Sequence, residues 1–574
     1  MEYKREASKE RLRMPHYIYA RAVAPQIDTR RVREWIACCK AEHHKCYETG
    51  FIAPAALENI RLIDVQKRQV VECDMGSKYI ALSYVWGAGT KGLLTRSTVK
   101  KYAREGSLAQ EDVPHTIRDA ILLVADLGER YLWVDSLCII QDDLPDKIRY
   151  LPMIGEIYDA AVVVIVAAVK NAHSGLPGRG GYERRQPRTT ETIQGIDFTF
   201  GQPHLEDYLQ TTVWNTRGWT YQEAQLARRT LVITDFQAYW SCQGGSWCED
   251  RSLEFPNWPR TPLGYNSLFA KSVLPDHTFR QTGTLTNVTI ELCSLGEYCQ
   301  NVKEFSSRSF SYRGDVLWAF AGILKSLLSI FPQGYIWAMP KAKLHSALLW
   351  KTNNTHNLHD PLIILNEKGD WQKLTVPSWC WLAKGTEVWY DDCYESIESM
   401  VEWHEPVHSE KPGPPNDSQG EEEEEERGKT MRSMIFQSNQ TFQGSTVFDF
   451  ALLHFTAEST ILRMHNLTFS GPHVYKCAMG SATLSLLSGE KIGSIDLPIS
   501  TFSSKKEIRG EFILLSLTPV DSNNPRRNSV EPMYNIMFVR WSDDKKFAHR
   551  IAWTEITKSA WEKCETRRKT IILA

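Results

Sequence analysis

Four short apolar runs in the first half of the chain are separated by segments with helical periodicity. The runs are rich in β-branched and aromatic residues, which are typical of strands. They occupy residues 79–86, 130–137, 162–168 and 230–235. The intervening segments predicted to be helices are residues 116–128, 146–161 and 217–229. Strands and helices in alternation favour an α/β fold with a parallel sheet flanked on both faces by helices.

The helix predicted over 116–128 carries signals at both of its ends. Thr116 and Asp119 stand three residues apart, which is the spacing of a capping box, and Gly128 stands where such a helix would end. In the next predicted helix, Pro152 must lie in the first turn or kink the chain, because proline has no N–H to donate.

The second half of the chain has a different character. We predict a helix at 311–324 and a strand at 377–383. Residues 409–429 combine Pro, Gly and Ser with six consecutive Glu, and because this composition cannot bury a core, we predict disorder there. Short strand candidates follow at 447–455, 510–517, 534–541 and 550–556.

These changes divide the chain into five predicted parts. They are an N-terminal helical or extended segment (1–78), an α/β core (79–240), an accessory region (241–408), an acidic disordered linker (409–430) and a β-rich C-terminal region (431–574).

Composition and charge exclude several classes of protein. The 574 residues are 42% hydrophobic and 24% charged, which is typical of a globular protein. A net charge of -2 gives no basic excess for binding nucleic acid. No apolar run reaches the roughly 18 residues that a membrane span needs. The N-terminus lacks the apolar core of a signal peptide and the 13 Cys follow no disulfide spacing, so we expect reduced thiols and a cytoplasmic protein.

Polar side chains gather where the predicted strands end. Ser83 and Tyr84 lie near the end of the first run, and Asp135 and Ser136 lie near the end of the second. Because ligands bind at the carboxyl ends of parallel strands, these four are candidate binding residues. Asp135 has a second interpretation, favoured by turn statistics, in which it caps the following loop. Cys138 is interpreted as a buried inert thiol rather than a nucleophile.

The predicted helix before the fourth run supplies the remaining candidates. Trp219 and Glu223 are four residues apart and therefore share one helix face, and Arg217 precedes them. The residue types alone favour a structural role, with Trp219 in the core. Glu223 would then lie at the rim, in a salt bridge with Arg217, Arg228 or Arg229.

A cluster of Cys and His precedes the sheet. Cys39, His43 and Cys46 have the spacing of metal ligands, with the adjoining cysteine and histidine as alternates. A structural zinc needs four ligands, and the fourth would come from a distant residue such as Cys73. The incomplete set favours the packing of a small N-terminal helix over zinc binding.

Several long motifs follow one another in a fixed order. They read "YIALSYVWG", "VPHTIRDAILLVADLGERYLWVDSLCIIQDD", "MIGEIYDAAVVVIVAA" and "RGWTYQE". Ahead of them stands "WIACCKAEHHKC", which is similar to an element found before the domain of the family named next. Together these motifs resemble the fungal heterokaryon incompatibility (HET) family, over a core of about 80–235. The resemblance implies a role in non-self recognition and programmed cell death when incompatible fungal cells fuse.

The resemblance also implies a chemistry. HET domains are thought to be distant relatives of TIR domains, which have a flavodoxin-like parallel sheet, and some TIR domains cleave NAD+ at the nicotinamide–ribose bond. The catalytic Glu of those domains lies in a W-x3-E pattern, which Trp219 and Glu223 match. The implied roles are Glu223 as the catalytic residue, NAD+ as substrate with no cofactor required, and a substrate site lined by Ser83, Tyr84, Asp135, Ser136, Arg217 and Trp219.

A competing interpretation is a signalling module without enzymatic activity. Such a module would assemble with its own copies or with a receptor-like or incompatibility-partner protein, and we expect self-association in either case. Glu223 pointing into a cleft beside Ser83 and Asp135 would favour catalysis, whereas Glu223 paired with an Arg on the outside would favour a scaffold. We predict no nucleic-acid partner and no membrane span.

Overall fold

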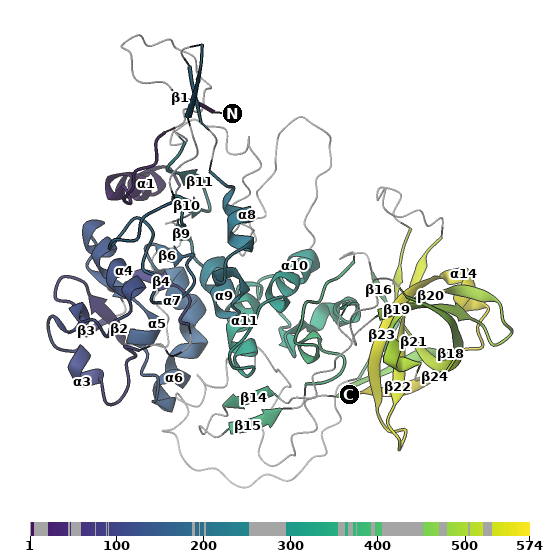
Figure 1. Ribbon diagram of the computed structural model, residues 1–574. Helices are drawn as coiled ribbons and strands as arrows, with labels where there is room; N and C mark the ends of the chain where they lie inside the picture. Colours follow the sequence, from purple (N-terminus) through teal and green to yellow (C-terminus); the bar gives the residue numbers. More distant parts are fainter. Residues whose placement is uncertain are drawn as a thin grey trace, which may run out of the picture. The chain divides into compact units, whose positions relative to one another are not determined.

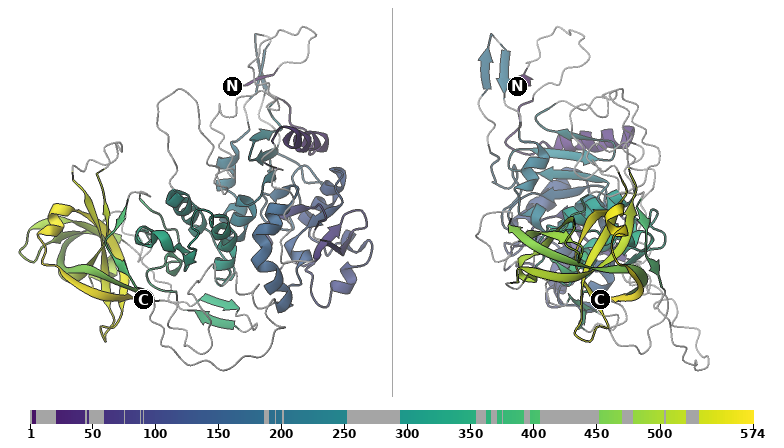
Figure 2. Two further views of the ribbon diagram at one scale, coloured as in Figure 1. Left: turned by 180° about the vertical axis from the view of Figure 1, so that it is seen from behind. Right: turned by 90° about the vertical axis from the view of Figure 1, so that its right-hand side faces the viewer.

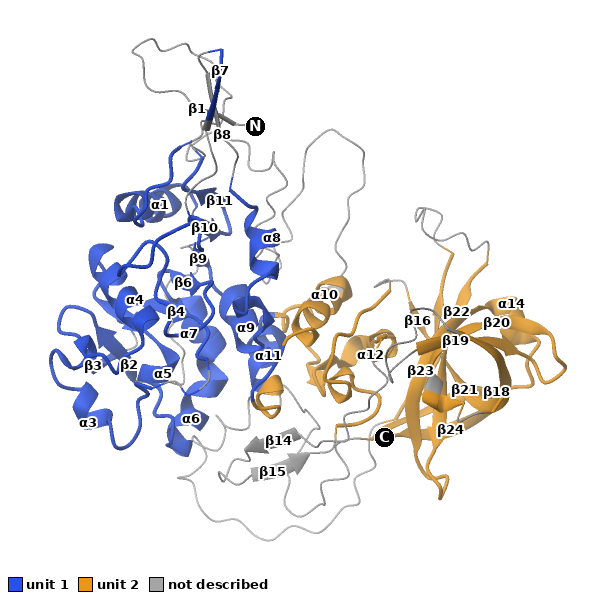
Figure 3. Ribbon diagram, in the orientation of Figure 1, with its two compact units in different colours: residues 1–274, 309–311, 318–326 blue, residues 275–308, 312–317, 327–574 orange. Residues whose placement is uncertain are grey.

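The computed structural model of the chain (Figure 1, Figure 2) forms two compact units, each described here by itself. It describes residues 2–4, 21–43, 46, 59–74, 76–87, 89, 91–185, 190–194, 196–199, 202–251, 294–353, 362–365, 371–374, 376–391, 397–404, 452–469, 479–502, 505–520 and 531–574. The first unit consists of residues 1–274, 309–311 and 318–326, and the second of the remainder (Figure 3). The acidic linker predicted over 409–430 lies outside the described residues.

An eight-stranded mixed sheet is the centre of the first unit. Its strands lie in the order β11-β10-β9-β6-β4-β5-β2-β3. Their bounds are β2 Asn59–Asp64, β3 Gln69–Asp74, β4 Ile80–Ser83, β5 Tyr131–Trp133, β6 Val164–Ala167, β9 Arg229–Ile233, β10 Ala238–Cys242 and β11 Gly245–Cys248. The four predicted strands are present and pair in parallel. The sheet is nevertheless mixed, because antiparallel hairpins extend it at both edges.

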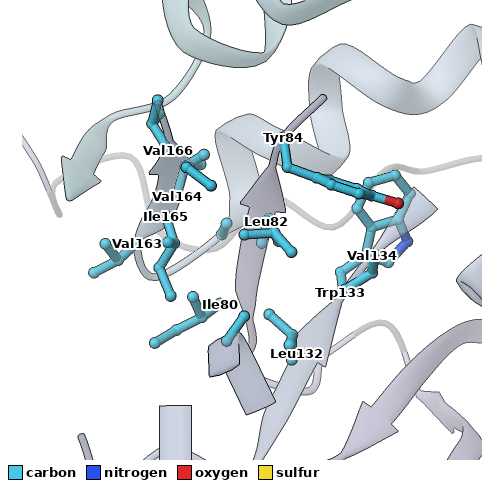
Figure 4. Close-up of a cluster of buried hydrophobic side chains, with 14 of the residues drawn as sticks. Ile80, Leu82, Tyr84, Leu132, Trp133, Val134, Val163, Val164, Ile165 and Val166 are labelled. Atoms are coloured by element: carbon cyan, nitrogen blue, oxygen red, sulfur yellow. The ribbon is translucent and has the colours of Figure 1, made fainter. Parts of the chain in front are cut away.

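The four parallel strands have a topology that creates one reversal point. Numbered by their order in the chain as β4, β5, β6 and β9, they lie in the order 2-1-3-4. The strand order therefore reverses between β4 and β6, which is where ligands bind in open α/β sheets. Leu82 of β4 pairs with Ile165 of β6, and Ile80 pairs with Leu132 of β5 (Figure 4). All residues of β4, β6 and β9 are buried, so both faces of this central part are covered.

Helices and helical turns connect and cover these strands. In the first unit they are α1 Thr29–Glu42, α3 Val99–Tyr102, η1 Ser107–Ala109, α4 His115–Asp126, α5 Asp135–Cys138, α6 Leu144–Tyr150, η2 Leu151–Met153, α7 Ile154–Ala160, α8 Leu205–Gln210, η3 Trp214–Thr216 and α9 Trp219–Gln225. Helix α11, Asp315–Ser326, contributes its residues 318–326. A small separate sheet joins β1 Glu2–Lys4, β7 Thr190–Ile193 and β8 Ile196–Thr199.

Helix α4 differs from its prediction at one end. Gly128 has φ +84° just after the helix, which confirms the predicted stop, because glycine adopts this conformation without strain. The predicted capping box does not form. Thr116 Oγ1 donates instead to the Asn171 carbonyl (3.3 Å), and the Asp119 carboxylate accepts from the Leu176 amide (2.9 Å). Both side chains serve the loop after β6, which competes for their hydrogen bonds.

The two other predicted helices are shorter or interrupted. The segment 146–161 breaks into α6, η2 and α7, and Pro152 lies in the 3-10 turn between the helices. The missing N–H of proline explains this break. The helix predicted over 217–229 is confined to α9, because Arg229 already belongs to β9.

The second unit is β-rich at its carboxyl end, as predicted. Its nine-stranded sheet consists of β16 Glu398–Ser399, β17 Glu402–Trp403, β18 Leu453–Phe469, β19 Met479–Ser485, β20 Lys491–Pro498, β21 Glu507–Thr518, β22 Met533–Trp541, β23 Ala548–Thr557 and β24 Arg567–Leu573. Strand β18 pairs with both β21 and β24, so the sheet curves back on itself (Figure 2). Phe512, Ile536 and Phe538 lie in its core.

The smaller elements of the second unit precede or flank this sheet. They are α10 Ser294–Ser306, β12 Tyr335–Ile336, β13 Met339–Pro340, η4 Lys341–Lys343, α12 Leu344–Ala347, β14 Leu362–Leu365, β15 Trp371–Leu374, η5 Trp381–Ala383, η7 Ile499–Thr501 and α14 Lys558–Glu562. The strand predicted at 377–383 is wrong, because the amides of Cys380 and Ala383 bond three residues back and form turns. Among the described residues, no helix has the length and apolarity to cross a bilayer.

Candidate functional site

The carboxyl end of β4 places a buried hydroxyl at the reversal point of the sheet. Ser83 is the last residue of this strand and is fully buried. Its Oγ donates to Oε2 of Glu223 (2.5 Å) and accepts from Nε1 of Trp214 (2.9 Å). One hydroxyl thus joins a strand end, the turn η3 and the helix α9.

Helix α9 holds Glu223 against this strand end. Immediately before the helix, Gly218 packs so closely on Phe310 that an added Cβ would lie 1.9 Å from the ring. The Gly218 amide donates to the Ser309 carbonyl (3.0 Å), which fixes the start of α9. With the helix so placed, Glu223 is only 6% exposed and faces inward.

Tyr158 of α7 is the second hydroxyl beside Glu223. It donates to the carbonyl of Leu82 in β4 (3.1 Å) and also hydrogen-bonds to the Glu223 carboxyl group. The contacts of Ser83 and Tyr158 each favour the ionised form of Glu223, because hydrogen bonds donated to a carboxylate lower its pKa.

The carboxyl end of β5 supplies a second carboxylate. Trp86 Nε1 donates to Oδ2 of Asp135 (2.8 Å), and the Ser136 amide donates to Oδ1 (2.7 Å). The second bond is the loop cap that turn chemistry favours for Asp135. The ring of Tyr84 points toward Val134 at the end of β5 (Figure 4), and its hydroxyl donates to Ser136 Oγ (2.7 Å).

Burial and mutual repulsion shift the titration of Glu223. Burial, followed by repulsion from Asp135, raises the pKa of Glu223 to about 8, while Ser83, Tyr158 and the positive charge of Arg217 oppose the rise. Desolvation disfavours a charged carboxylate, and a neighbouring negative charge disfavours it further. Glu223 is therefore mostly protonated at neutral pH.

Asp135 titrates below its neighbour. Burial raises the pKa of Asp135 to about 6, and the hydrogen bonds from Trp86 and Ser136, with the charge of Arg217, limit the rise. At pH 7 the pair therefore holds about one negative charge and one proton. Two carboxyl groups whose pKa values are pushed apart at strand ends are typical of a functional site.

The site has an enclosed interior and a partly exposed rim. Its buried members are Ser83, Tyr84, Ser136, Tyr158, Trp214 and Glu223. Its half-buried members are Trp86, Asp135, Arg217 and Trp219. Glu223 is thus enclosed, while Asp135, Arg217 and two indole rings are partly exposed.

The structure brings most of the candidate residues together. Glu223 lies inside with Ser83 rather than at the rim. Of the arginines considered as its salt-bridge partners, Arg228 pairs with Asp159 (2.7 Å) and Arg229 donates to the Val162 carbonyl (2.6 Å). Trp219 is half-buried and packs against the core of the first unit.

Cys138 is the thiol that the sequence places closest to this site. It is fully buried, and this burial raises the pKa of its thiol to about 12, as expected for an inert thiol.

Two contributors to the site were not foreseen. Trp214 stands five residues before Trp219, and Tyr158 stands one turn before the third strand, inside the motif "MIGEIYDAAVVVIVAA", which gave it no role at the site. The W-x4-W spacing of Trp214 and Trp219 was the one local signal available.

The predicted metal-ligand residues lie elsewhere in the first unit. Cys39, His43 and Cys46 come together with Cys242 at the end of β10. The suggestion of Cys73 as the fourth ligand is wrong. Cys73 belongs to β3, at one edge of the sheet, whereas β10 lies near the opposite edge.

Comparison with known proteins gives one finding about identity. Neither the curated proteins nor the solved structures contain a match to this chain. The family comparison supports the resemblance found in the sequence for one segment, which contains Ser83, Asp135 and Glu223. Residues 79–223 match the family model described as Heterokaryon incompatibility protein (HET).

Proposed function

We propose that this protein acts in fungal heterokaryon incompatibility and its cell-death response, and that its first unit hydrolyses NAD+ with Glu223 as the catalytic residue. The match of residues 79–223 to the HET family model supports the biological role. The observation that carries the chemistry is the placement of Glu223, buried beside Ser83 at the reversal point and close enough to Asp135 and Arg217 for their charges to shift its pKa.

The strand order supports a TIR-like interpretation of the sheet. The parallel order 2-1-3-4 is the beginning of the flavodoxin-like order 2-1-3-4-5, in which the ligand binds between the first and third strands. Here those strands are β4 and β6, and antiparallel β10 stands where a fifth parallel strand would be. Glu223 bonds to the last residue of the first strand, so its carboxyl group lies at this position.

Hydrolysis of NAD+ requires an ionised carboxylate near the ribose, whereas it needs little acid catalysis. In hydrolysis of NAD+, the bond between ribose C1′ and the nicotinamide nitrogen breaks, and its electron pair leaves with nicotinamide, which becomes neutral. Water adds to C1′ and releases a proton, which gives ADP-ribose. The ribosyl carbon is oxocarbenium-like in between, so an ionised Glu223 stabilises it electrostatically and accepts hydrogen bonds from the ribose hydroxyls.

The charges of the site suit a cationic substrate ring. Around neutral pH the carboxyl pair carries one charge and retains a proton on Glu223. The positive nicotinamide ring of NAD+ would lower the pKa of Glu223, because an opposite charge favours ionisation. Binding would thus convert the resting acid into the carboxylate that the reaction needs.

The half-buried rim provides groups for the rest of the molecule. Trp219 is a candidate for stacking on the nicotinamide ring, because aromatic faces pack against planar rings. Arg217 is a candidate for the pyrophosphate, because a guanidinium binds two phosphate oxygens at once. Since Glu223 is enclosed, access requires local movement, and self-association is one event that could supply it.

An NAD+ consumption assay tests the proposal. The full-length protein is assayed over a range of concentrations, with nicotinamide and ADP-ribose measured as products. We expect consumption that rises with association and is abolished in Glu223→Ala and Glu223→Gln. Glu111→Ala, which removes an exposed carboxylate of the same unit, is the matched control and should retain full activity.

The competing function is a signalling module without catalysis. The burial of Glu223 is compatible with a structural role in such a module. NAD+ consumption that is equal in wild type and Glu223→Ala would remove the catalytic assignment. Absence of consumption at every concentration, with cell death retained in Glu223→Gln, would favour the module.

A further inference from the structure

Four metal-binding side chains converge where helix α1 meets the β10/β11 hairpin. Cys39 and His43 lie at the carboxyl end of α1, Cys46 follows it, and Cys242 is the last residue of β10. One ligand atom from each lies within 4.8 Å of all the others. Nδ1 of His43 is 3.2 Å from Sγ of Cys242. Cys242 stands almost two hundred residues after Cys46 in the chain, so the tertiary fold brings it to the other three ligands.

We propose that these residues form a structural zinc site. Zinc prefers four ligands in a tetrahedron, with Zn–S about 2.3 Å and Zn–N about 2.0 Å, so neighbouring ligand atoms stand roughly 3.5–3.8 Å apart. Here the ligand atoms all lie within 4.8 Å of one another and the shortest stated distance is 3.2 Å, so side-chain adjustments of about 1 Å would bring them to that range. Three thiolates and one imidazole with no place for water are the ligand set of a closed structural site rather than a catalytic one.

Neighbouring residues contact the ligands and fix their positions. Gly244, in the turn between β10 and β11, lies against the imidazole of His43, and an added Cβ would be 2.2 Å from that ring. The Gly244 amide also hydrogen-bonds to the thiol of Cys46. His43 stacks on Trp247 at 5.5 Å between ring centroids, which fixes the orientation of its imidazole. Such contacts to the ligands are a regular feature of metal sites.

The charge of the site is also compensated. Zinc with three thiolates and a neutral imidazole carries a net charge of about -1, from the charges of the ion and its ligands. The buried Arg229 places Nη1 2.5 Å from the carbonyl oxygen of Cys46. A guanidinium beside a buried anionic centre stabilises it, because a low-dielectric interior strengthens the attraction.

The site would tie the N-terminal segment to the sheet. Helix α1 packs through Val32, Trp35 and Cys39, and its last turn faces the edge hairpin. A metal bridging α1 and β10 closes a loop that spans the HET-matching segment. Its binding free energy would add to folding, because the unfolded chain does not hold the four ligands together.

A metal analysis of the full-length protein tests this proposal. Protein purified under reducing conditions should contain one zinc per chain. Cys242→Ser and Cys39→Ser should lose it, with at least a tenfold drop in zinc affinity. Cys38→Ser is the matched control, because Cys38 adjoins the cluster without contributing to it, and it should keep its zinc.

Cobalt substitution of the wild-type protein answers the question even if the Cys variants do not fold. Co2+ should give the ligand-field bands and sulfur charge-transfer absorption of a tetrahedral thiolate site, and Zn2+ should abolish them. Zinc retained by Cys242→Ser, zinc lost equally from Cys38→Ser, a wild-type protein that binds neither metal, or a disulfide between two of the three cysteines in unreduced peptides would each overturn the proposal.

Discussion

Replacing Glu223 by glutamine should make the stability of the protein less sensitive to alkaline pH. Glutamine keeps the shape of the protonated acid and never ionises. In the wild type, the pKa of Glu223 is raised from the ordinary 4.5 to about 8. Each pKa unit corresponds to about 1.36 kcal/mol. The shift of 3.5 units therefore corresponds to about 5 kcal/mol of unfolding free energy, which the wild type loses on going from acid to alkaline pH and Glu223→Gln does not.

The direction follows from where the proton is held. Between pH 4.5 and 8 the unfolded chain releases the Glu223 proton and the folded chain retains it. The stability that protonated Glu223 contributes is therefore fully present below pH 4.5 and is lost as the pH rises through 8. The free energy of unfolding of Glu223→Gln, relative to wild type, should be flat in acid and should rise by about 3 kcal/mol at pH 7 and about 5 kcal/mol above pH 8.

Urea unfolding from pH 4 to 9, followed by circular dichroism and tryptophan fluorescence, measures this difference. A constant offset from altered hydrogen bonds to Ser83 does not matter, because only the slope with pH reports the buried carboxyl group. Glu111→Gln should give a curve parallel to the wild type, since Glu111 is exposed. A Glu223→Gln difference that stays level or falls between pH 5 and 8 would refute the reasoning.

Three further perturbations have definite expected outcomes. The kcat/KM for NAD+ cleavage should rise with pH toward a plateau above about 8, because the free protein must ionise Glu223, and a flat profile would contradict this role. Ser83→Ala should lower the free energy of unfolding by about 1–3 kcal/mol, because the Trp214 N–H loses its buried acceptor, and an unchanged urea midpoint would contradict it. Gly218→Ala should destabilise the first unit by about 1–3 kcal/mol through contact with Phe310, which thermal melting would detect.

The sequence predicts the centre of the sheet well because burial on both faces leaves a continuous apolar run. Strands β4, β6 and β9 are wholly buried and were predicted at their correct places. The edge strand β3 has one buried residue among half-buried and exposed ones and lacks such a run, so the sequence does not predict it. The buried strands β2 and β10 contain polar residues such as Arg61 and Ser241, which interrupt the apolar run, and the sequence does not predict them either.

Some residues of the candidate site could be predicted from local sequence and others could not. Ser83 and Asp135 could be proposed together because parallel strands direct their carboxyl ends to one edge, whereas Glu223 is proposed from the W-x3-E resemblance. Tyr158 reaches Glu223 only because α7 packs on α9, and Cys242 reaches His43 only because β10 extends the sheet beyond β9. Such contacts depend on tertiary packing between distant segments, for which no spacing along the chain gives a signal.

The way the stability of Glu223→Gln changes with pH, taken with its activity, separates the two functions proposed for the first unit. A carboxyl group retained only for packing stabilises the fold, so its replacement by an uncharged side chain lowers stability. Glu223 is held next to Asp135, and ionising it works against folding. A protein that keeps such a group gives up stability at neutral pH, which is typical of catalytic and binding residues. If the stability of Glu223→Gln relative to wild type rises with pH while NAD+ cleavage is lost, burial of the acid serves the chemistry. If that difference does not rise with pH and cleavage is unaffected, Glu223 is a structural residue of an assembly module.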